Sequence, residues 1–395
     1  MANKVSSDIL IVSGVCFLRA YSGTLHMARA LRDSGHTVRV LVSATEAEAV
    51  EYAALDISVY CLLRRERLGF FRKWQTIRHR LKVFFEILRS QQVIITENDY
   101  LLEASIAKKI RRNSLKLGQY CQELHLYDEY PTIPRIRIYN RLARVPDLVI
   151  DVEPNRARAR MIRLGLPEMP LILRNTLPMS SIPRRSTRGG LAILAGRSLP
   201  EGRNILLHMG GVGKEKPLER VIDAIAVCNA SVFFLAFCNA PEAQIAELNR
   251  YASRSLSPDA YAITGPRKRD ELLASAWEAD VGIVDYSPSV ENTSNQRYCA
   301  PTKLYEFMAL GLAVVGSDND SLRDIIVMED IGECAEDGST AALAAALERA
   351  VHDPDRLRSM KERASRCFQS RHSYEALCLP AVQQISRAIE RNSDS

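Results

Sequence analysis

A polar loop, 286–300, follows the short apolar run 281–285, and a segment with Lys303 and Glu306 comes directly after it. From residue 298 the sequence reads Tyr298-Cys299-Ala300-Pro301-Thr302-Lys303-Leu304-Tyr305-Glu306. Pro301 is suited to open a helix, because a first-turn residue needs no N–H for the helix ladder. The N–H groups near Thr302 and Lys303 would then point outward and favour an anion such as a diphosphate. Glu306 would lie one turn later, where a carboxylate can accept hydrogen bonds from both hydroxyls of a ribose.

A second candidate segment for phosphate contact is rich in glycine and lysine. It reads Gly210-Gly211-Val212-Gly213-Lys214-Glu215-Lys216-Pro217 and also follows an apolar run. Gly211 lets the backbone approach a phosphate closely, and Lys214 and Lys216 supply positive charge. Gly23, near the start of the chain, fits either the same role or that of a tight turn. The ordinary alternative for the lysines and for Glu306 is a solvated surface with an ion pair.

Apolar runs alternate with helical patterns through the first half of the chain. The expected strands are 8–13, 37–42, 57–62, 93–97, 115–121 and 148–152. Helical spacing occurs between them, at 46–54, 70–90 and 101–112. Gly23 and Thr24 open a further helical pattern that Gly35 is placed to end. Strands that alternate with helices predict a mostly parallel sheet covered by helices on both faces.

A second series of the same kind begins at residue 204. Its expected strands are 204–208, 231–237, 260–264, 281–285, 313–316 and 331–334, and a helical tail follows over 340–391. Single cores rarely exceed ~250–300 residues, so two domains are expected. The segment 179–203 is rich in Pro, Gly, Ser and Arg, which is typical of a linker. The expected domains are 1–178 and 204–372, with a C-terminal helix in 373–395 that crosses back to the first.

The net charge of +6 is distributed unevenly over the 395 residues. Residues 1–180 hold 28 basic and 18 acidic residues, whereas the rest of the chain holds 25 and 29. A basic half favours phosphorylated partners. Nine scattered cysteines without a Cys-x-x-Cys pair, and a polar N-terminus, favour reduced thiols and a cytoplasmic location. No apolar run reaches the ~18 residues that a membrane span needs, so no transmembrane helix is expected.

The order of elements around Pro301 carries a family resemblance. The expected order is a strand, a polar loop, a helix with Pro-x-Lys-x-x-Glu, a glycine and another strand. This order resembles the nucleotide-sugar motif of family 4 glycosyltransferases and their GT-B relatives. Weaker likenesses are the unit 8–42, the run Gln122-Glu123-Leu124 with Glu129, and Asn175 before the linker. The resemblance implies the GT-B fold, with two Rossmann-like doubly wound domains and a cleft between them. It also implies transfer of a sugar from a nucleoside diphosphate sugar, with UDP as the expected nucleotide.

The resemblance assigns donor binding to specific residues of this chain. They are Gly23, Gly211, Lys214, Lys216, Tyr298, Thr302, Lys303, Leu304 and Glu306. Tyr298 departs from the family pattern, because many members place there a glutamate that reaches the sugar, and Gly211 stands where an arginine contacts the phosphates. The sugar contact and the retaining stereochemistry that the resemblance favours depend on these two positions. No metal or other cofactor is expected, so Lys216, Lys303 and the helix dipole would neutralise the leaving diphosphate.

Two residues are candidates for activating or orienting the acceptor. Glu123 and His125 follow the expected strand 115–121, on a loop that the resemblance turns toward the donor. In an inverting enzyme one of them would serve as the general base, whereas in a retaining enzyme they would orient the acceptor or the donor. A solvated loop histidine is the ordinary alternative for His125. The expected acceptor is a carbohydrate or a lipid-linked precursor, in polysaccharide or glycolipid assembly.

The stretch 64–82 holds eight basic residues against one acid, with aromatic residues interleaved. The residues expected to form a membrane or acceptor surface are Arg64, Arg65, Arg72, Lys73 and Trp74. A basic helix with aromatic side chains can lie on an anionic bilayer, here the inner face of the plasma membrane. The alternative is a solvated helix whose aromatic side chains pack inward.

Other function classes compete with sugar transfer. A non-catalytic GT-B homologue that acts as a binding or partner subunit is favoured by Tyr298 and Gly211, whereas Glu306, Lys303 and Lys216 favour the enzyme. A Rossmann oxidoreductase would need Gly-x-Gly-x-x-Gly after its first strand, and residues 14–19 lack it. No recognition motif supports a nucleic-acid partner.

Overall fold

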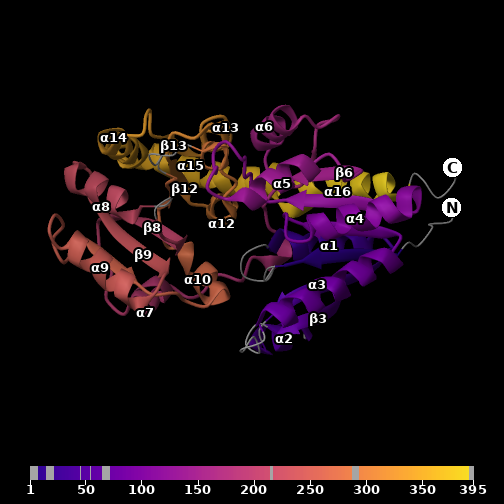
Figure 1. Cartoon of the computed structure of the whole chain (residues 1–395). Coiled ribbons are helices and arrows are strands. Elements are labelled where there is room, and N and C mark those ends of the chain that lie inside the picture. The colour runs from indigo at the N-terminus through magenta and orange to yellow at the C-terminus, as the bar shows by residue number, and fades with distance from the viewer. Residues whose placement is uncertain are drawn as a thin grey trace. The chain divides into compact units, whose positions relative to one another are not determined.

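The computed structural model describes residues 8–14, 22–44, 46–53, 55–64, 72–213, 217–286 and 293–390. These residues divide into two compact units (Figure 1). Unit 1 comprises the described residues up to Asn175 together with those from Leu377 onward, and unit 2 comprises Thr176–Ala376. Each unit has one parallel sheet covered by helices, which confirms the prediction of two doubly wound α/β domains.

The sheet of unit 1 has seven strands in the order β3-β2-β1-β4-β5-β6-β7. The strands are β1 (Asp8–Ser13), β2 (Thr37–Ala44), β3 (Ser58–Arg64), β4 (Gln92–Thr96), β5 (Lys116–Cys121), β6 (Leu148–Asp151) and β7 (Leu171–Ile172). All neighbouring pairs are parallel. The first six match the predicted strands to within two residues at each end, because their buried side chains form continuous apolar runs. β7 has only two residues, too few to show a pattern.

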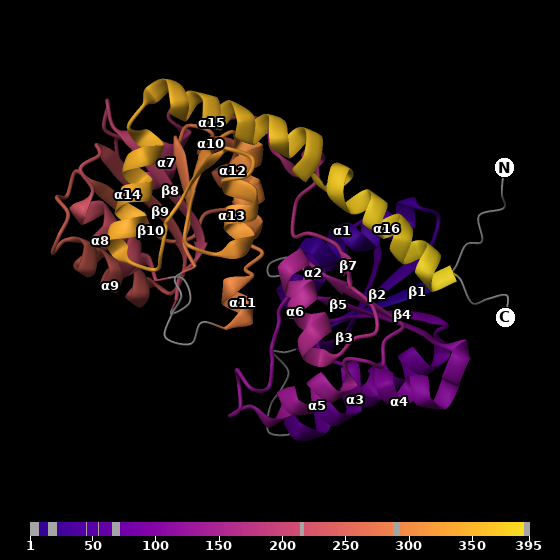
Figure 2. The same cartoon turned by 90° about the horizontal axis from the view of Figure 1, so that it is seen from above.

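Helices cover both faces of this sheet. They are α1 (Ser22–Asp33), α2 (Glu46–Ala53), α3 (Arg72–Arg89), α4 (Leu101–Arg111), α5 (Pro134–Leu142), α6 (Pro154–Leu164) and most of α16 (Tyr374–Glu390). In Figure 2, α3, α4 and α5 lie along one face of the sheet, and α1 and α16 lie along the other. α16 is held to unit 1 by a hydrogen bond between His36 and Ser386, both of which are buried.

The sheet of unit 2 has six strands in the order β10-β9-β8-β11-β12-β13, again all parallel. The strands are β8 (Asn204–Gly211), β9 (Val232–Asn239), β10 (Tyr261–Thr264), β11 (Val281–Val284), β12 (Ala313–Gly316) and β13 (Gly332–Cys334). The longer helices are α8 (Leu218–Val227), α9 (Glu242–Ala252), α10 (Arg269–Ala276), α12 (Thr302–Leu310), α14 (Thr340–Val351) and α15 (Pro354–Cys367). Shorter ones are α7 (Gly190–Ala195), α11 (Ser294–Arg297) and α13 (Asp320–Ile326).

The segment 179–203, whose composition indicates a linker, lies within unit 2. It forms α7, which packs on α10 and places Leu191 fully inside the core. The carboxylate of Glu278 accepts hydrogen bonds from the N–H groups of Gly189 and Gly190 and so holds the start of this helix. A helix of six residues is too short for apolar periodicity to reveal it.

Candidate donor-binding and acceptor-side sites

The segment around Pro301 forms a strand–loop–helix–strand unit in unit 2. β11 ends at Val284, and α12 begins at Thr302, directly after Pro301. Gly311, with a φ of 71°, ends α12 in the left-handed conformation, as predicted, and β12 then runs parallel to β11. The N-terminus of α12 therefore lies at the carboxyl edge of the sheet, where ligands of doubly wound folds bind.

Glu306 lies one turn into α12 and is held by an arginine that the sequence prediction did not include. Its Oε1 accepts hydrogen bonds from Nε and Nη2 of Arg269, at 3.1 and 2.7 Å. The Glu306 side chain is 13% exposed, whereas that of Arg269, at the start of α10, is 50% exposed. Both bonds go to Oε1, so the pair fixes the carboxylate of Glu306 while Oε2 keeps its capacity to accept a hydroxyl.

Lys303 belongs to a group of buried charges next to the same helix terminus. Its side chain is buried, and Nζ lies 5.9 Å from the ring centroid of Tyr286. Asp285, directly after β11, pairs with Arg220 of α8 at 2.7 Å, and both side chains are buried. Burial raises the pKa of Asp285, while the charges of Arg220 and Lys303 and a hydrogen bond from Ser317 act in the opposite direction. Lys303 and Arg220 thus place two cations near the N-terminus of α12, and cations at a helix N-terminus suit a diphosphate.

The other predicted donor residues lie in different surroundings. Thr302 is half-buried at the first position of α12, whereas the side chain of Leu304 lies in the core and offers no side-chain contact to a ligand. Tyr298, at the end of α11, is half-buried, and the guanidinium of Arg297 lies over its ring at 5.6 Å. Gly211 is exposed as the last residue of β8. Lys214 and Lys216 lie outside the described residues.

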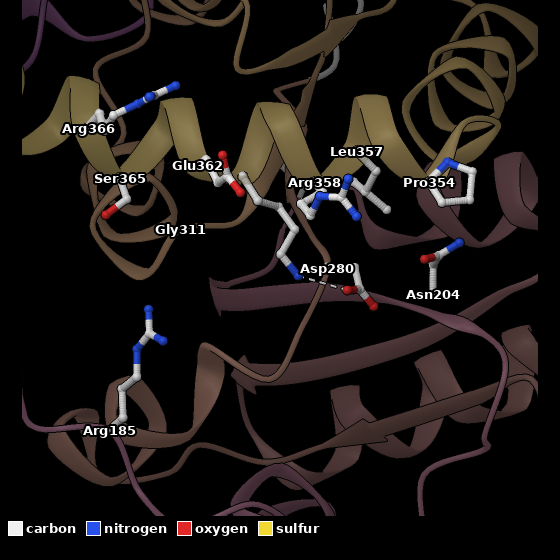
Figure 3. Close-up of a pocket in the computed structure, with 11 residues that line it drawn as sticks. Arg185, Asn204, Asp280, Gly311, Pro354, Leu357, Arg358, Glu362, Ser365 and Arg366 are labelled. Carbon is white, nitrogen blue, oxygen red and sulfur yellow. Dashed lines mark hydrogen bonds and ion pairs between the residues drawn. The ribbon is translucent and has the colours of Figure 1, made fainter.

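A cavity of about 700 Å³ in unit 2 lies at the opposite edge of the sheet (Figure 3). Asn204, Asp280 and Gly311 line it, and each of them stands at or just before the beginning of a strand. Lys361 of α15 pairs with Asp280 there, at 2.8 Å. Since doubly wound sheets bind ligands at the carboxyl ends of their strands, this cavity is not the candidate donor site.

Unit 1 carries a network of buried polar groups at the carboxyl edge of its own sheet. Glu97 directly follows β4 and has a φ of 55°, which is uncommon for a residue other than glycine. Its Oε1 accepts the N–H groups of Gln122 and Glu123, at 2.5 and 3.1 Å. The carbonyl groups of the same two residues accept hydrogen bonds from Arg156 and Arg160 of α6. The backbone that carries Glu123 is therefore held from both sides.

The two predicted acceptor-side residues lie on this held segment. The Glu123 side chain is 37% exposed, and its Oε2 lies 4.0 Å from Nη1 of Arg156. His125 is half-buried, its carbonyl accepts a hydrogen bond from Asn140, and its ring meets that of Tyr130 edge to face. Burial lowers the pKa of His125, which keeps the ring neutral at pH 7 and able to accept a proton.

Gly23 lies at the start of α1, against Tyr120. A Cβ at position 23 would meet the Tyr120 hydroxyl at 2.4 Å and Asn175 Oδ1 at 3.3 Å. Gly23 is buried. Close packing therefore accounts for this glycine, and its predicted phosphate contact stays a prediction.

The predicted membrane or acceptor surface falls largely outside what the structure describes. Arg65 is outside the described residues. Arg64 belongs to β3, and Arg72, Lys73 and Trp74 belong to the start of α3, but the described side chains of α3 begin at Thr76. The role of these residues stays a prediction.

Sequence reasoning missed Arg269, Asp285, Arg220 and Glu97. The sequence could have indicated Asp285 and Glu97, because each is a charged residue directly after a buried parallel strand. Arg269 and Arg220 had none, since they reach Glu306 and Asp285 from helices distant in sequence. Among the described residues, no group of three His, Cys, Asp or Glu side chains is placed to hold a metal ion. Within the same residues, no helix has the length and apolar character needed to cross a bilayer.

Comparison with known proteins supports α12 of unit 2 as part of the candidate donor site. Residues 295–366, which include α12, match the family model described as glycosyl transferases group 1. No curated protein matches the sequence of the chain. Among solved structures, the chain is similar to Alr3699/HepE of Anabaena in complex with UDP and glucose, with 16% identity and a TM-score of 0.74 over 98% of this chain and 100% of that one.

Two further solved structures have a similar fold. Sucrose-phosphate synthase of Thermosynechococcus elongatus has 16% identity and a TM-score of 0.72, over 98% of this chain and 100% of that one. A glycosyltransferase of Rickettsia africae has 15% identity and a TM-score of 0.74, over 99% and 100%. At such identities the likeness establishes the fold. The chain therefore has the GT-B fold, and its residues 295–366 are similar to the group 1 glycosyl transferases.

Proposed function

We propose that the chain transfers a sugar from a UDP-sugar to a carbohydrate or lipid-linked acceptor. The observation that carries this proposal is the N-terminus of α12 at the carboxyl edge of the sheet, with Lys303 in the first turn and Glu306 one turn later. The family match includes this helix. HepE, similar in fold, has been solved with UDP and glucose, which supports UDP as the nucleotide.

The donor would lie with its diphosphate at the start of α12. The N–H groups of the first helical turn and the buried cations Lys303 and Arg220 supply the positive charge that a diphosphate needs. Glu306, fixed by Arg269, would accept hydrogen bonds from the ribose hydroxyls through Oε2. In the transition state, charge develops on the leaving diphosphate, so the same cations would stabilise it without a metal ion.

The acceptor would be met by the held segment of unit 1. If the reaction inverts the anomeric centre, neutral His125 or Glu123 serves as the general base. If it retains the centre, as we propose from the family resemblance, both residues orient the acceptor. The anomeric configuration of the product, read by NMR, distinguishes the two.

A non-catalytic partner subunit is the second candidate. It is favoured by Tyr298, which stands where many relatives carry a glutamate. The pairing of Glu306 with Arg269 also favours it, because an ion pair gives that carboxylate a structural reason to be there. This candidate predicts a protein without nucleotide affinity, whereas the transferase requires it.

Calorimetric titration of the full chain with UDP, GDP and their sugar conjugates tests the proposal. We expect binding of a uridine nucleotide with a dissociation constant in the micromolar range, weakened at least ~30-fold in Glu306→Ala by the loss of two charge-assisted hydrogen bonds. Glu362→Ala is the matched control, because Glu362 is an exposed helix residue beside the cavity at the opposite edge. No binding of any nucleotide would overturn the proposal and favour the partner subunit.

A further inference from the structure

Two neighbouring helices of unit 1 expose rows of large apolar side chains. The row on α3 consists of Ile77, Leu81 and Phe85. The row on α4 consists of Leu102, Ile106 and Ile110. Each of the six side chains is between 40% and 60% exposed. Within each row the spacing is four residues, which places the members on one face of the helix.

The rows lie on adjacent helices of one layer. α4 packs against α3 on one flank and α5 on the other, on the same face of the sheet (Figure 2). Ile138 of α5, 49% exposed, adds a further apolar side chain. A groove of about 710 Å³ beside α4 is lined by Leu102, Ile106, Leu142 and Val145. We call the exposed sides of these helices the α3–α5 face, defined by the two rows and Ile138.

The same helices are strongly basic. α3, α4 and α5 together contain 12 lysines and arginines and two acidic residues. Both acids are paired, Glu86 with Arg39 and Arg89, and Glu103 with Arg80. Six exposed cations of these helices take part in no ion pair among the described residues: Arg78, Lys82, Lys109, Arg135, Arg137 and Arg141. The α3–α5 face therefore combines apolar side chains with uncompensated positive charge.

We propose that the α3–α5 face docks the chain on an anionic phospholipid bilayer. Aliphatic side chains that enter the headgroup region gain from leaving water, while neighbouring cations gain from the lipid phosphates. The surface extends from the part of α3 with described side chains across α4 and α5. It overlaps the stretch 64–82, at which membrane contact was expected from the sequence alone, and adds the exposed sides of α4 and α5.

Charge and polarity argue against other occupants. A second copy of the chain would bring two equally positive faces together, which opposes self-pairing. A nucleic acid would satisfy the cations, but seven exposed apolar side chains would face sugars and phosphates that give them no apolar partner. An anionic bilayer meets both requirements at once.

Flotation of the full chain with lipid vesicles tests the docking. We expect binding to phosphatidylcholine vesicles that contain about 30% phosphatidylglycerol, weak binding to pure phosphatidylcholine, and a decrease with salt. Ile106→Ser with Ile110→Ser should weaken the partition at least ~10-fold. The matched control, Ile193→Ser with Val227→Ser, alters exposed aliphatic residues of unit 2 and should stay within about twofold of the wild type.

A charge variant tests separately whether the exposed cations of the α3–α5 face are needed for binding to anionic lipid. Lys82→Glu with Lys109→Glu should abolish the preference for phosphatidylglycerol, and circular dichroism should show an unchanged fold because both side chains are exposed. Equal binding to neutral and anionic vesicles, or no vesicle binding, would overturn the proposal. So would binding of duplex DNA without vesicles, or a dimer that the isoleucine variant dissociates. Glu306→Ala should bind vesicles like the wild type, so this outcome is separate from the donor proposal.

Discussion

Replacement of Glu97 by glutamine should leave the chain about as stable as the wild type at pH 5 and make it more stable at pH 9. The carboxyl of Glu97 accepts the N–H groups of Gln122 and Glu123 through one oxygen, which an amide oxygen can replace. Burial, and after it the charge of Glu123, raise the pKa of Glu97 to about 8, against the opposing effects of the Gln122 hydrogen bond, Arg160 and Arg156. Glutamine keeps the two hydrogen bonds and cannot ionise.

The size of the effect follows from the two pKa values. An unfolded glutamate ionises with a pKa of 4.5, whereas Glu97 in the folded chain ionises only near 8. A raised pKa means that the contribution to stability is full below pH 4.5 and falls by about 1.4 kcal/mol per pH unit until pH 8. The complete loss is at most about 5 kcal/mol. Because Glu97 as a residue is partly exposed, we expect roughly 2–4 kcal/mol.

Urea unfolding at several pH values between about 5 and 9 measures this difference. Far-UV circular dichroism follows the unfolding at each pH. Glu247→Gln, an exposed glutamate of α9, is the control that should show no pH-dependent difference from the wild type. A constant difference between wild type and Glu97→Gln from pH 5 to pH 9 would refute the raised pKa. A variant that is less stable throughout would mean that the ionised carboxylate is what holds the segment.

Two further substitutions test the packing of the candidate sites by thermal unfolding. Asp285→Ala should destabilise unit 2 by about 3–5 kcal/mol, because it leaves buried Arg220 without its partner, and Asp285→Leu with Arg220→Met should recover most of the loss. Unchanged melting in Asp285→Ala would show that the pair is solvated. Gly23→Ala should cost about 1–3 kcal/mol through the clash with the Tyr120 hydroxyl, and Tyr120→Phe in the same chain should restore it. Equal effects of Gly23→Ala in both backgrounds would place the clash elsewhere.

The fold was predictable because its strands are buried on both faces. Such strands appear as continuous apolar runs, and 8–13 and 313–316 coincide with β1 and β12 to the residue. Short elements were not predictable, since α7 has six residues and β7 has two. The prediction of a linker at 179–203 rested on composition, and composition cannot show that Leu191 is fully buried.

The candidate donor site was predictable only in its continuous part. Pro301, Lys303 and Glu306 stand within one helix, so their spacing alone determines their arrangement. The groups that surround them come from elsewhere: Arg269 lies 37 positions from Glu306, and Arg220 lies 65 positions from Asp285. No local pattern in the sequence relates residues at such separations, because the sheet order that brings them together is a property of the whole unit.

Both units use charged groups beyond buried strands, but for different physical ends. In unit 1, Glu97 and two arginines of α6 form hydrogen bonds with the backbone of Gln122 and Glu123. These charged side chains therefore hold the loop in position. In unit 2, Lys303 and the Asp285–Arg220 pair lie near the N-terminus of α12, at the carboxyl edge of the sheet. A loop held rigidly suits an acceptor that must be oriented, and cations beside a helix N-terminus suit a diphosphate that must be bound and then released. The buried charged groups of unit 1 therefore fit the proposed role of orienting the acceptor, and those of unit 2 fit the proposed role of binding the donor diphosphate.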